Sequence, residues 1–181
     1  MKPISQMDLP ELAAMVSTHL RHARIQAVLS GGACVTVYTR NAYPSFDLDF
    51  IENVSSPPRR LKSVMAELGF APKNRYFVHP ETPFFVEFPS GPLSAGEEPL
   101  TEIIQRRYET GTLTLISPTE CIKDRLAAYY HWQDRQCLKQ ALMVAQEEPI
   151  NLQEIERWSV NEGKGALFLS IQSLLQSASG P

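Results

Sequence analysis

The sequence has few cysteines and no long apolar run, and both absences limit the kind of protein it encodes. Its 181 residues include three cysteines, an odd number without C-x-x-C spacing, so we expect neither a disulfide framework nor a thiolate zinc site. No stretch approaches the roughly 18 apolar residues of a membrane span. The first residues lack the apolar segment of a secretory signal. We therefore expect a cytoplasmic protein with reduced thiols and no membrane association.

An excess of charge of one sign is also lacking. The chain carries 17 Lys and Arg against 20 Asp and Glu, a net charge of -3, so no overall positive field attracts a polyanion. Any anionic ligand must then be held by a local group of residues. The apolar fraction of 43% and the charged fraction of 20% are ordinary for a globular protein, and the length suits one domain with at most a small appended lobe.

Periodicity and helix-start signals divide the chain into two parts. Strand-like and helical segments alternate up to residue 116, and helical patterns alone follow Pro118. We expect a mixed α/β (α+β) fold, with a small mixed β-sheet flanked by helices in residues 1–116, a helical lobe in 117–176 and a flexible tail in 177–181. The expected elements are helices at 8–24, 33–40 and 59–68, strands at 25–29, 45–51, 75–79, 84–88 and 112–116, and up to four helices thereafter.

The stretch "SGGACVTVYTRNAYPSFDLDF", residues 30–50, places two carboxylates in a strand-like segment. Asp47 and Asp49 alternate with apolar residues, so they project from one face of the expected strand. Their Cα atoms are then roughly 6 to 7 Å apart, and the two charges repel unless a cation lies between them. Oxygen ligands of this kind suit Mg²⁺ or Mn²⁺. Asp-x-Asp by itself also occurs on solvated strand ends, so the metal site is an expectation that depends on its surroundings.

The turn before this strand supplies the features of an anion site. Gly31 and Gly32 lack a Cβ, so a ligand can approach the backbone N–H groups at the start of the expected short helix. Ser30 adds a hydroxyl. Lys123, in the first turns of the helix after Pro118, is within reach of a triphosphate on one interpretation and lies on a solvated helix face on the other.

A third carboxylate is available on a later strand. Glu87 is the only acid in "FFVEF" (84–88), and phosphoryl transfer with two metal ions requires a further carboxylate to bind the second ion and to activate the attacking hydroxyl. The alternative is an edge-strand glutamate that faces water.

Taken together, these residues resemble the nucleotidyltransferase superfamily of the DNA polymerase β type. The resemblance covers about residues 26–145 and is strongest to minimal bacterial members, including toxins of the abortive-infection type. It implies transfer of a nucleoside monophosphate from a nucleoside triphosphate (NTP) to a hydroxyl, with Asp47, Asp49 and Glu87 as the metal-binding and catalytic carboxylates. By the same match, Gly31 and Gly32 take the phosphate-binding role, and Ser30 and Lys123 are the further residues that we expect to bind the NTP. Related members often have an arginine four residues before the first aspartate, where this chain has Tyr43.

Two functions of different class follow from this resemblance. The first is a Mg²⁺-dependent enzyme whose acceptor is a tRNA end, a protein hydroxyl or a small molecule. The second is a nucleotide-binding or partner-binding module, with weak or no activity, in a toxin–antitoxin type system that includes a cognate partner protein. Glu87 distinguishes them, because a carboxylate beside the Asp pair indicates catalysis and one pointing to solvent indicates binding.

Overall fold

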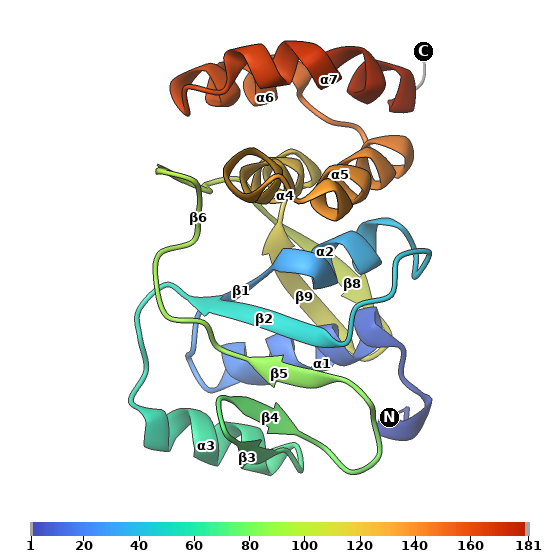
Figure 1. The fold of residues 1–181 in the computed structure, drawn as a ribbon. Coiled ribbons are helices and arrows are strands. Elements are labelled where there is room, and N and C mark those ends of the chain that lie inside the picture. Colours follow the sequence, from blue (N-terminus) through green and yellow to red (C-terminus); the bar gives the residue numbers. More distant parts are fainter. Residues whose placement is uncertain (1, 180–181) are drawn as a thin grey trace.

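The computed structural model describes residues 2–179, arranged in layers around one mixed sheet (Figure 1). After a single 3₁₀ turn, Ile4–Gln6, the helices are α1 (Leu9–His22), α2 (Gly31–Tyr38), α3 (Pro58–Glu67), α4 (Pro118–Trp132), α5 (Arg135–Glu147), α6 (Leu152–Asn161) and α7 (Gly165–Ala178). The strands are β1 (Ala27–Ser30), β2 (Asp47–Glu52), β3 (Ala71–Lys73), β4 (Tyr76–Val78), β5 (Phe85–Glu87), β6 (Ser94–Ala95), β7 (Glu98–Pro99), β8 (Ile103–Tyr108) and β9 (Gly111–Ile116).

The main sheet has seven strands in the order β3-β4-β5-β2-β1-β9-β8. β2 and β5 are parallel, as are β1 and β9, and the remaining neighbours are antiparallel. Helices α1 and α3 lie on one side of the sheet, and α2 lies on the other, beneath α4 and α5 (Figure 1). The predicted fold class, a mixed sheet flanked by helices and followed by further helices, is confirmed.

Helix α1 begins with a capping box. The Asp8 side chain accepts a hydrogen bond from the Glu11 N–H, and the Glu11 carboxylate accepts one from the Asp8 N–H. Two hydroxyls on its buried face fix the helix to β9: Thr18 Oγ1 accepts from the Thr112 N–H at 2.7 Å, and Ser17 Oγ accepts from the Thr114 N–H at 3.0 Å. These bonds satisfy the backbone of β9 on the side that faces α1.

Strand β2 separates its apolar and acidic side chains onto opposite faces, as its alternating sequence predicts. Leu48 and Phe50 are fully buried, whereas Asp47 and Asp49 are only partly buried. Burial of these two apolar side chains fixes which face of the strand points into the core, because a slip of one residue would place both carboxylates there instead.

The helical lobe consists of α4–α7. Ser117 is the single residue between the last strand of the sheet, β9, and the first helix of the lobe, α4. Residues 117–120 have the Ser-x-x-Glu pattern of a capping box, but only one half of the box forms. Ser117 Oγ accepts from the Glu120 N–H, but the Glu120 carboxylate accepts from the N–H groups of Thr101 and Glu102 instead of reaching back to Ser117. The hydrophobic core continues from the sheet into the lobe without interruption.

Some elements differ from the sequence-based expectation. Strands β3, β6, β7 and β8 are additional, and α7 continues to Ala178, so residues 177 and 178 are helical and do not belong to a tail. Residues 180 and 181 of the expected tail lie outside the described residues. Within residues 2–179, none of the helices combines the length and the apolar character that a membrane crossing requires.

Candidate active site

The turn between β1 and α2 leaves the amino end of a helix without a side-chain cap. Ser30 is the last residue of β1 and the N-cap of α2, yet its side chain makes no capping hydrogen bond. Its hydroxyl instead donates to the Asp49 carbonyl at 3.4 Å. The first N–H groups of a helix have no partner within the helix, so those of α2 are available to a ligand. An uncapped helix start of this kind is suited to an anion.

The two glycines of this turn lie against different side chains. Gly31 has a φ of +70°, and a Cβ on it would lie 2.7 Å from Asp49 Oδ2. A Cβ on Gly32 would lie 3.2 Å from Ser45 Oγ. The missing side chain of Gly31 therefore allows the carboxylate of Asp49 to lie directly against the turn, which brings the predicted metal ligand next to the predicted phosphate site.

The three carboxylates singled out in the sequence are neighbours in the sheet. Asp49 is the register partner of Ser30 in β1 on one side and of Glu87 in β5 on the other. Asp47 lies two residues earlier on the same face and accepts a hydrogen bond from Ser45 Oγ at 2.5 Å. Because β5 has a neighbour on each side, Glu87 is not on an edge strand. Its side chain is 18% exposed and pairs with Arg75 Nε at 3.1 Å.

The electrostatic environment of Asp49 is unfavourable for a carboxylate. Burial, together with the nearby charges of Asp47 and Glu87, raises the pKa of Asp49 to about 7. The positive charge of Arg125, which lies in α4, acts in the opposite direction and lowers the pKa of Asp49. A site in which a carboxylate is disfavoured by burial and by like charges is stabilised by binding a cation.

The donor set fits a hard divalent cation whose coordination is completed by substrate. Within residues 2–179, no three His, Cys, Asp or Glu side chains are gathered closely enough to form a metal site by themselves. Mg²⁺ usually takes only one or two carboxylates and fills its other positions with water and substrate phosphates. Asp47 and Asp49, beside an uncapped helix start, match that requirement, and Glu87 is held by Arg75 from the turn between β3 and β4.

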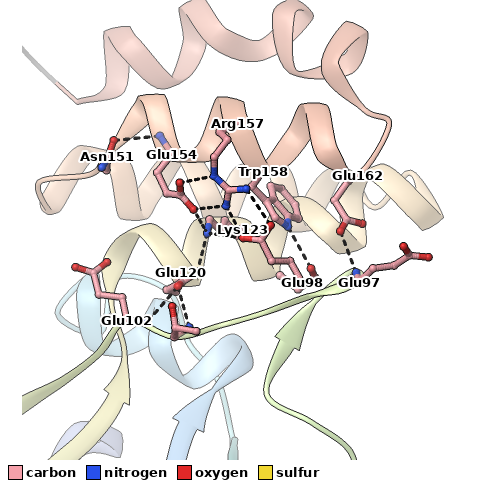
Figure 2. Close-up of polar contacts among 12 residues, drawn as sticks. Glu97, Glu98, Glu102, Glu120, Lys123, Asn151, Glu154, Arg157, Trp158 and Glu162 are labelled. Carbon is pink, nitrogen blue, oxygen red and sulfur yellow. Dashed lines mark hydrogen bonds and ion pairs between the residues drawn. The ribbon is translucent and has the colours of Figure 1, made fainter.

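Lys123 has a different environment from the one predicted. Its side chain is 3% exposed, and its amine lies 2.6 Å from Glu154, 3.2 Å from Glu120 and 3.6 Å from Glu98 (Figure 2). Arg157, in α6, donates hydrogen bonds to Glu98 and to Glu154. The lysine therefore belongs to an ion-pair cluster between α4, α6 and the β6–β7 hairpin, and it does not lie on a solvated helix face.

Two residues near the site were missed in the sequence. Arg125 is the positive charge that acts on Asp49, and its Nε and Nη2 bind Asp124 Oδ2 at 3.1 and 2.5 Å. Ser45 contacts Asp47 and flanks Gly32. The sequence offered a weak signal for Ser45, which shares the alternation of the Asp pair, and none for Arg125, whose place depends on how α4 packs against α2.

The fold resembles that of a solved protein, although the sequence matches no family model and no curated protein. The crystal structure of an antigenic nucleotidyltransferase-like protein from Paracoccidioides brasiliensis superposes with a TM-score of 0.65, at 13% identity, over 97% of this chain and 95% of that one. The solution structure of the antibiotic-resistance factor ANT(2'')-Ia covers 93% of this chain and 95% of its own, at 10% identity and a TM-score of 0.48. The first likeness shows that this chain has a nucleotidyltransferase-like fold.

Proposed function

We propose that the protein is a Mg²⁺-dependent nucleotidyltransferase that transfers a nucleoside monophosphate from an NTP to a hydroxyl and releases pyrophosphate. One observation carries this proposal. Asp49 is the register partner of both Ser30 and Glu87, so one strand joins the uncapped glycine turn to the three carboxylates. An anion site beside a group of carboxylates has the features that a metal-bound triphosphate requires.

The chain's own residues would bind the substrate from two sides. The N–H groups at Gly31 and Gly32, with the Ser30 hydroxyl, would hold the terminal phosphates, and Asp47 and Asp49 would hold Mg²⁺ or Mn²⁺. The bound ion would neutralise charge on the phosphates and orient them. The raised pKa of Asp49 is consistent with a carboxylate that is paired with a cation when the site is in use.

The transfer step needs a group that accepts the proton of the acceptor hydroxyl. That oxygen attacks the α-phosphorus, a new P–O bond forms, and the bond from the α-phosphorus to the bridging oxygen breaks, so pyrophosphate leaves. Glu87 is the carboxylate that we assign to receive the proton, by general-base catalysis. It lies beside Asp49, and its partner Arg75 has a side chain that is 72% exposed.

The ion pair of Glu87 with Arg75 also favours a second candidate. A carboxylate neutralised by an arginine does not need a second metal ion, and in that case the site binds a nucleotide without transferring it. The protein would then act as a nucleotide-binding or partner-binding module, alone or with a cognate partner protein of a toxin–antitoxin type system.

Radioactive labelling decides between these functions. The protein is incubated with Mg²⁺, a cell lysate and each α-labelled NTP, and the labelled product is separated as RNA, protein or small molecule, which identifies the acceptor class. The Asp49→Asn variant should label nothing. Glu81→Gln, which removes an exposed carboxylate from the loop between β4 and β5, serves as the matched control and should label as wild type does. Tight NTP binding without label from any NTP would favour the binding module, and neither label nor binding would refute both.

A further inference from the structure

Tyr43 lies beside the glycine turn, on the side away from Asp49. A Cβ on Gly31 would meet Asp49, whereas a Cβ on Gly32 would meet Ser45 and, at 4.0 Å, the ring of Tyr43. The chain reaches this position through two consecutive non-glycine residues with positive φ, Arg40 at 51° and Asn41 at 67°. Such residues are strained, and they persist where the surrounding structure holds them. The loop after α2 is thus turned back so that the Tyr43 ring flanks the start of the same helix.

The hydroxyl of Tyr43 accepts two hydrogen bonds from helix α5. Gln140 Nε2 donates to it at 2.7 Å, and Gln136 Nε2 donates at 3.1 Å. The orientation of the buried Gln140 amide is fixed from its other end, because its Oε1 accepts from Arg125 Nη1 at 3.4 Å. The amide nitrogen, and not the oxygen, therefore faces Tyr43.

These two bonds leave the tyrosine hydroxyl with a proton to donate. A hydroxyl has two acceptor positions and one donor. Both acceptor positions are filled by the glutamine amides, and across residues 2–179 no hydrogen bond is donated by the Tyr43 hydroxyl. Donors on the oxygen polarise the O–H bond and make the proton a better hydrogen-bond donor.

We propose that the Tyr43 hydroxyl donates a hydrogen bond to a phosphate oxygen of the ligand seated on the Gly31–Gly32 turn, held in place for this by Gln136 and Gln140. This inference deepens the proposed function and rests on it. The turn supplies backbone N–H groups on one side of the phosphate, and Tyr43 supplies a neutral donor on the other. Arg125, which orients Gln140, is the charged residue connected to the same network.

The test is the affinity of the Tyr43→Phe variant for phosphate ligands, measured by calorimetry in the presence of Mg²⁺. The probes are inorganic triphosphate, the NTP that binds wild type most tightly, and the corresponding nucleoside without phosphates. Phenylalanine keeps the ring beside Gly32 and removes only the hydroxyl. Loss of a hydrogen bond to a charged group typically weakens binding by roughly 10- to 100-fold. We expect this loss for the triphosphate and the NTP, and unchanged affinity for the nucleoside.

Two further variants separate this role from a purely structural one. Gln136→Leu removes one bond between the loop and α5 but leaves the Tyr43 hydroxyl, so it should weaken triphosphate binding by no more than about threefold, the loss of one ordinary hydrogen bond at most. Tyr129→Phe, whose hydroxyl makes no hydrogen bond within the described residues, is the matched control, and thermal melts of each variant establish that it is folded.

The outcomes distinguish the two proposals. Wild-type affinity of Tyr43→Phe for triphosphate would overturn the role of Tyr43 and leave the proposed function standing. Equal losses in Tyr43→Phe and Gln136→Leu would mean that Tyr43 only connects the loop to α5, which also overturns the inference. Failure of the wild-type protein to bind any NTP or triphosphate would overturn both.

Discussion

Asp49 and Glu87 lie directly beside each other on adjacent parallel strands, as register partners of β2 and β5. Residues in this relationship point to the same face of a sheet, and the charge of Glu87 acts on Asp49 by raising its pKa. The two residues are 38 positions apart in the sequence, and the parallel pairing of β2 with β5 places them side by side. This relationship brings the third carboxylate to the Asp pair and makes a catalytic function the stronger proposal.

Replacement of either aspartate by asparagine should abolish Mg²⁺-dependent nucleotide binding without unfolding the protein. Each variant removes one of two carboxylates that repel each other in the metal-free protein, so its melting temperature without ligand should equal or slightly exceed that of wild type. Thermal melts with and without Mg²⁺ and NTP measure both effects. If Asp47→Asn or Asp49→Asn retained the full ligand-dependent rise in melting temperature, that residue would not be a metal ligand.

The stability of the metal-free protein should depend on pH through Asp49. Its pKa is raised to about 7 in the folded protein, against about 3.9 in an unfolded chain. The folded state therefore binds the proton more tightly, and the stabilisation from this group is complete below about pH 4 and is lost as the pH rises through 7.

Urea unfolding of wild type and Asp49→Asn between pH 5 and pH 8 measures this dependence. The difference in unfolding free energy should change in favour of the variant by on the order of 2 to 4 kcal/mol over that range. A difference that stays constant with pH would show that Asp49 is not protonated in this range.

Substitution of Gly32 should affect ligand affinity more than folding. Gly32 lies within α2 and has no positive φ, and a Cβ at this position makes one close approach, to Ser45 Oγ at 3.2 Å. In Gly32→Val, two additional methyl groups would hold a phosphate away from the backbone N–H groups. Calorimetry should show that triphosphate affinity falls from wild type to Gly32→Ala and falls again from Gly32→Ala to Gly32→Val. Equal affinity in all three proteins would reduce the Gly31–Gly32 segment to a turn without a binding role.

Lys123 should be essential for stability and dispensable for nucleotide binding. In Lys123→Met the carboxylates of Glu98, Glu120 and Glu154 lose the buried amine between them, and removal of one partner from a buried ion pair typically costs about 3–5 kcal/mol. Arg157→Ala, at a side chain that is 45% exposed, should cost no more than about 1 kcal/mol. A Lys123→Met protein of normal stability that fails to bind NTP would instead support the phosphate-binding role predicted from the sequence.

The features of the site that depend on neighbouring residues in the chain could be predicted from the sequence. Alternation of Leu48 and Phe50 with the two aspartates determines which face of β2 is buried, and the glycine pair identifies the turn before α2. These patterns act over a few residues, so the local sequence contains them. The strand that carries Glu87 was predicted in the same way from its aromatic residues.

The features that depend on packing between distant segments could not be predicted. Lys123 and Arg125 are two residues apart in one helix, and the sequence does not show that the first faces Glu154 and the second acts on Asp49. Strand β8, "IIQRRY", was missed because its exposed residues are largely polar and its partner β9 is reached by a tight hairpin. The contact of Tyr43 with α5 similarly requires the position of a helix that begins 92 residues later.

The measurement that tests the central claim most directly is a comparison of wild type and Glu87→Gln for both transfer and binding. Glutamine is nearly isosteric with glutamate, so the packing of β5 should be kept. Labelling rate with α-labelled NTP and NTP affinity are measured on the same preparations. We predict nearly unchanged affinity, because Asp47, Asp49 and the glycine turn remain, and a labelling rate lower by several hundred-fold, in line with general-base effects of roughly 10²–10⁴. Equal labelling rates in the two proteins would contradict the assignment of Glu87 to the chemistry of this site.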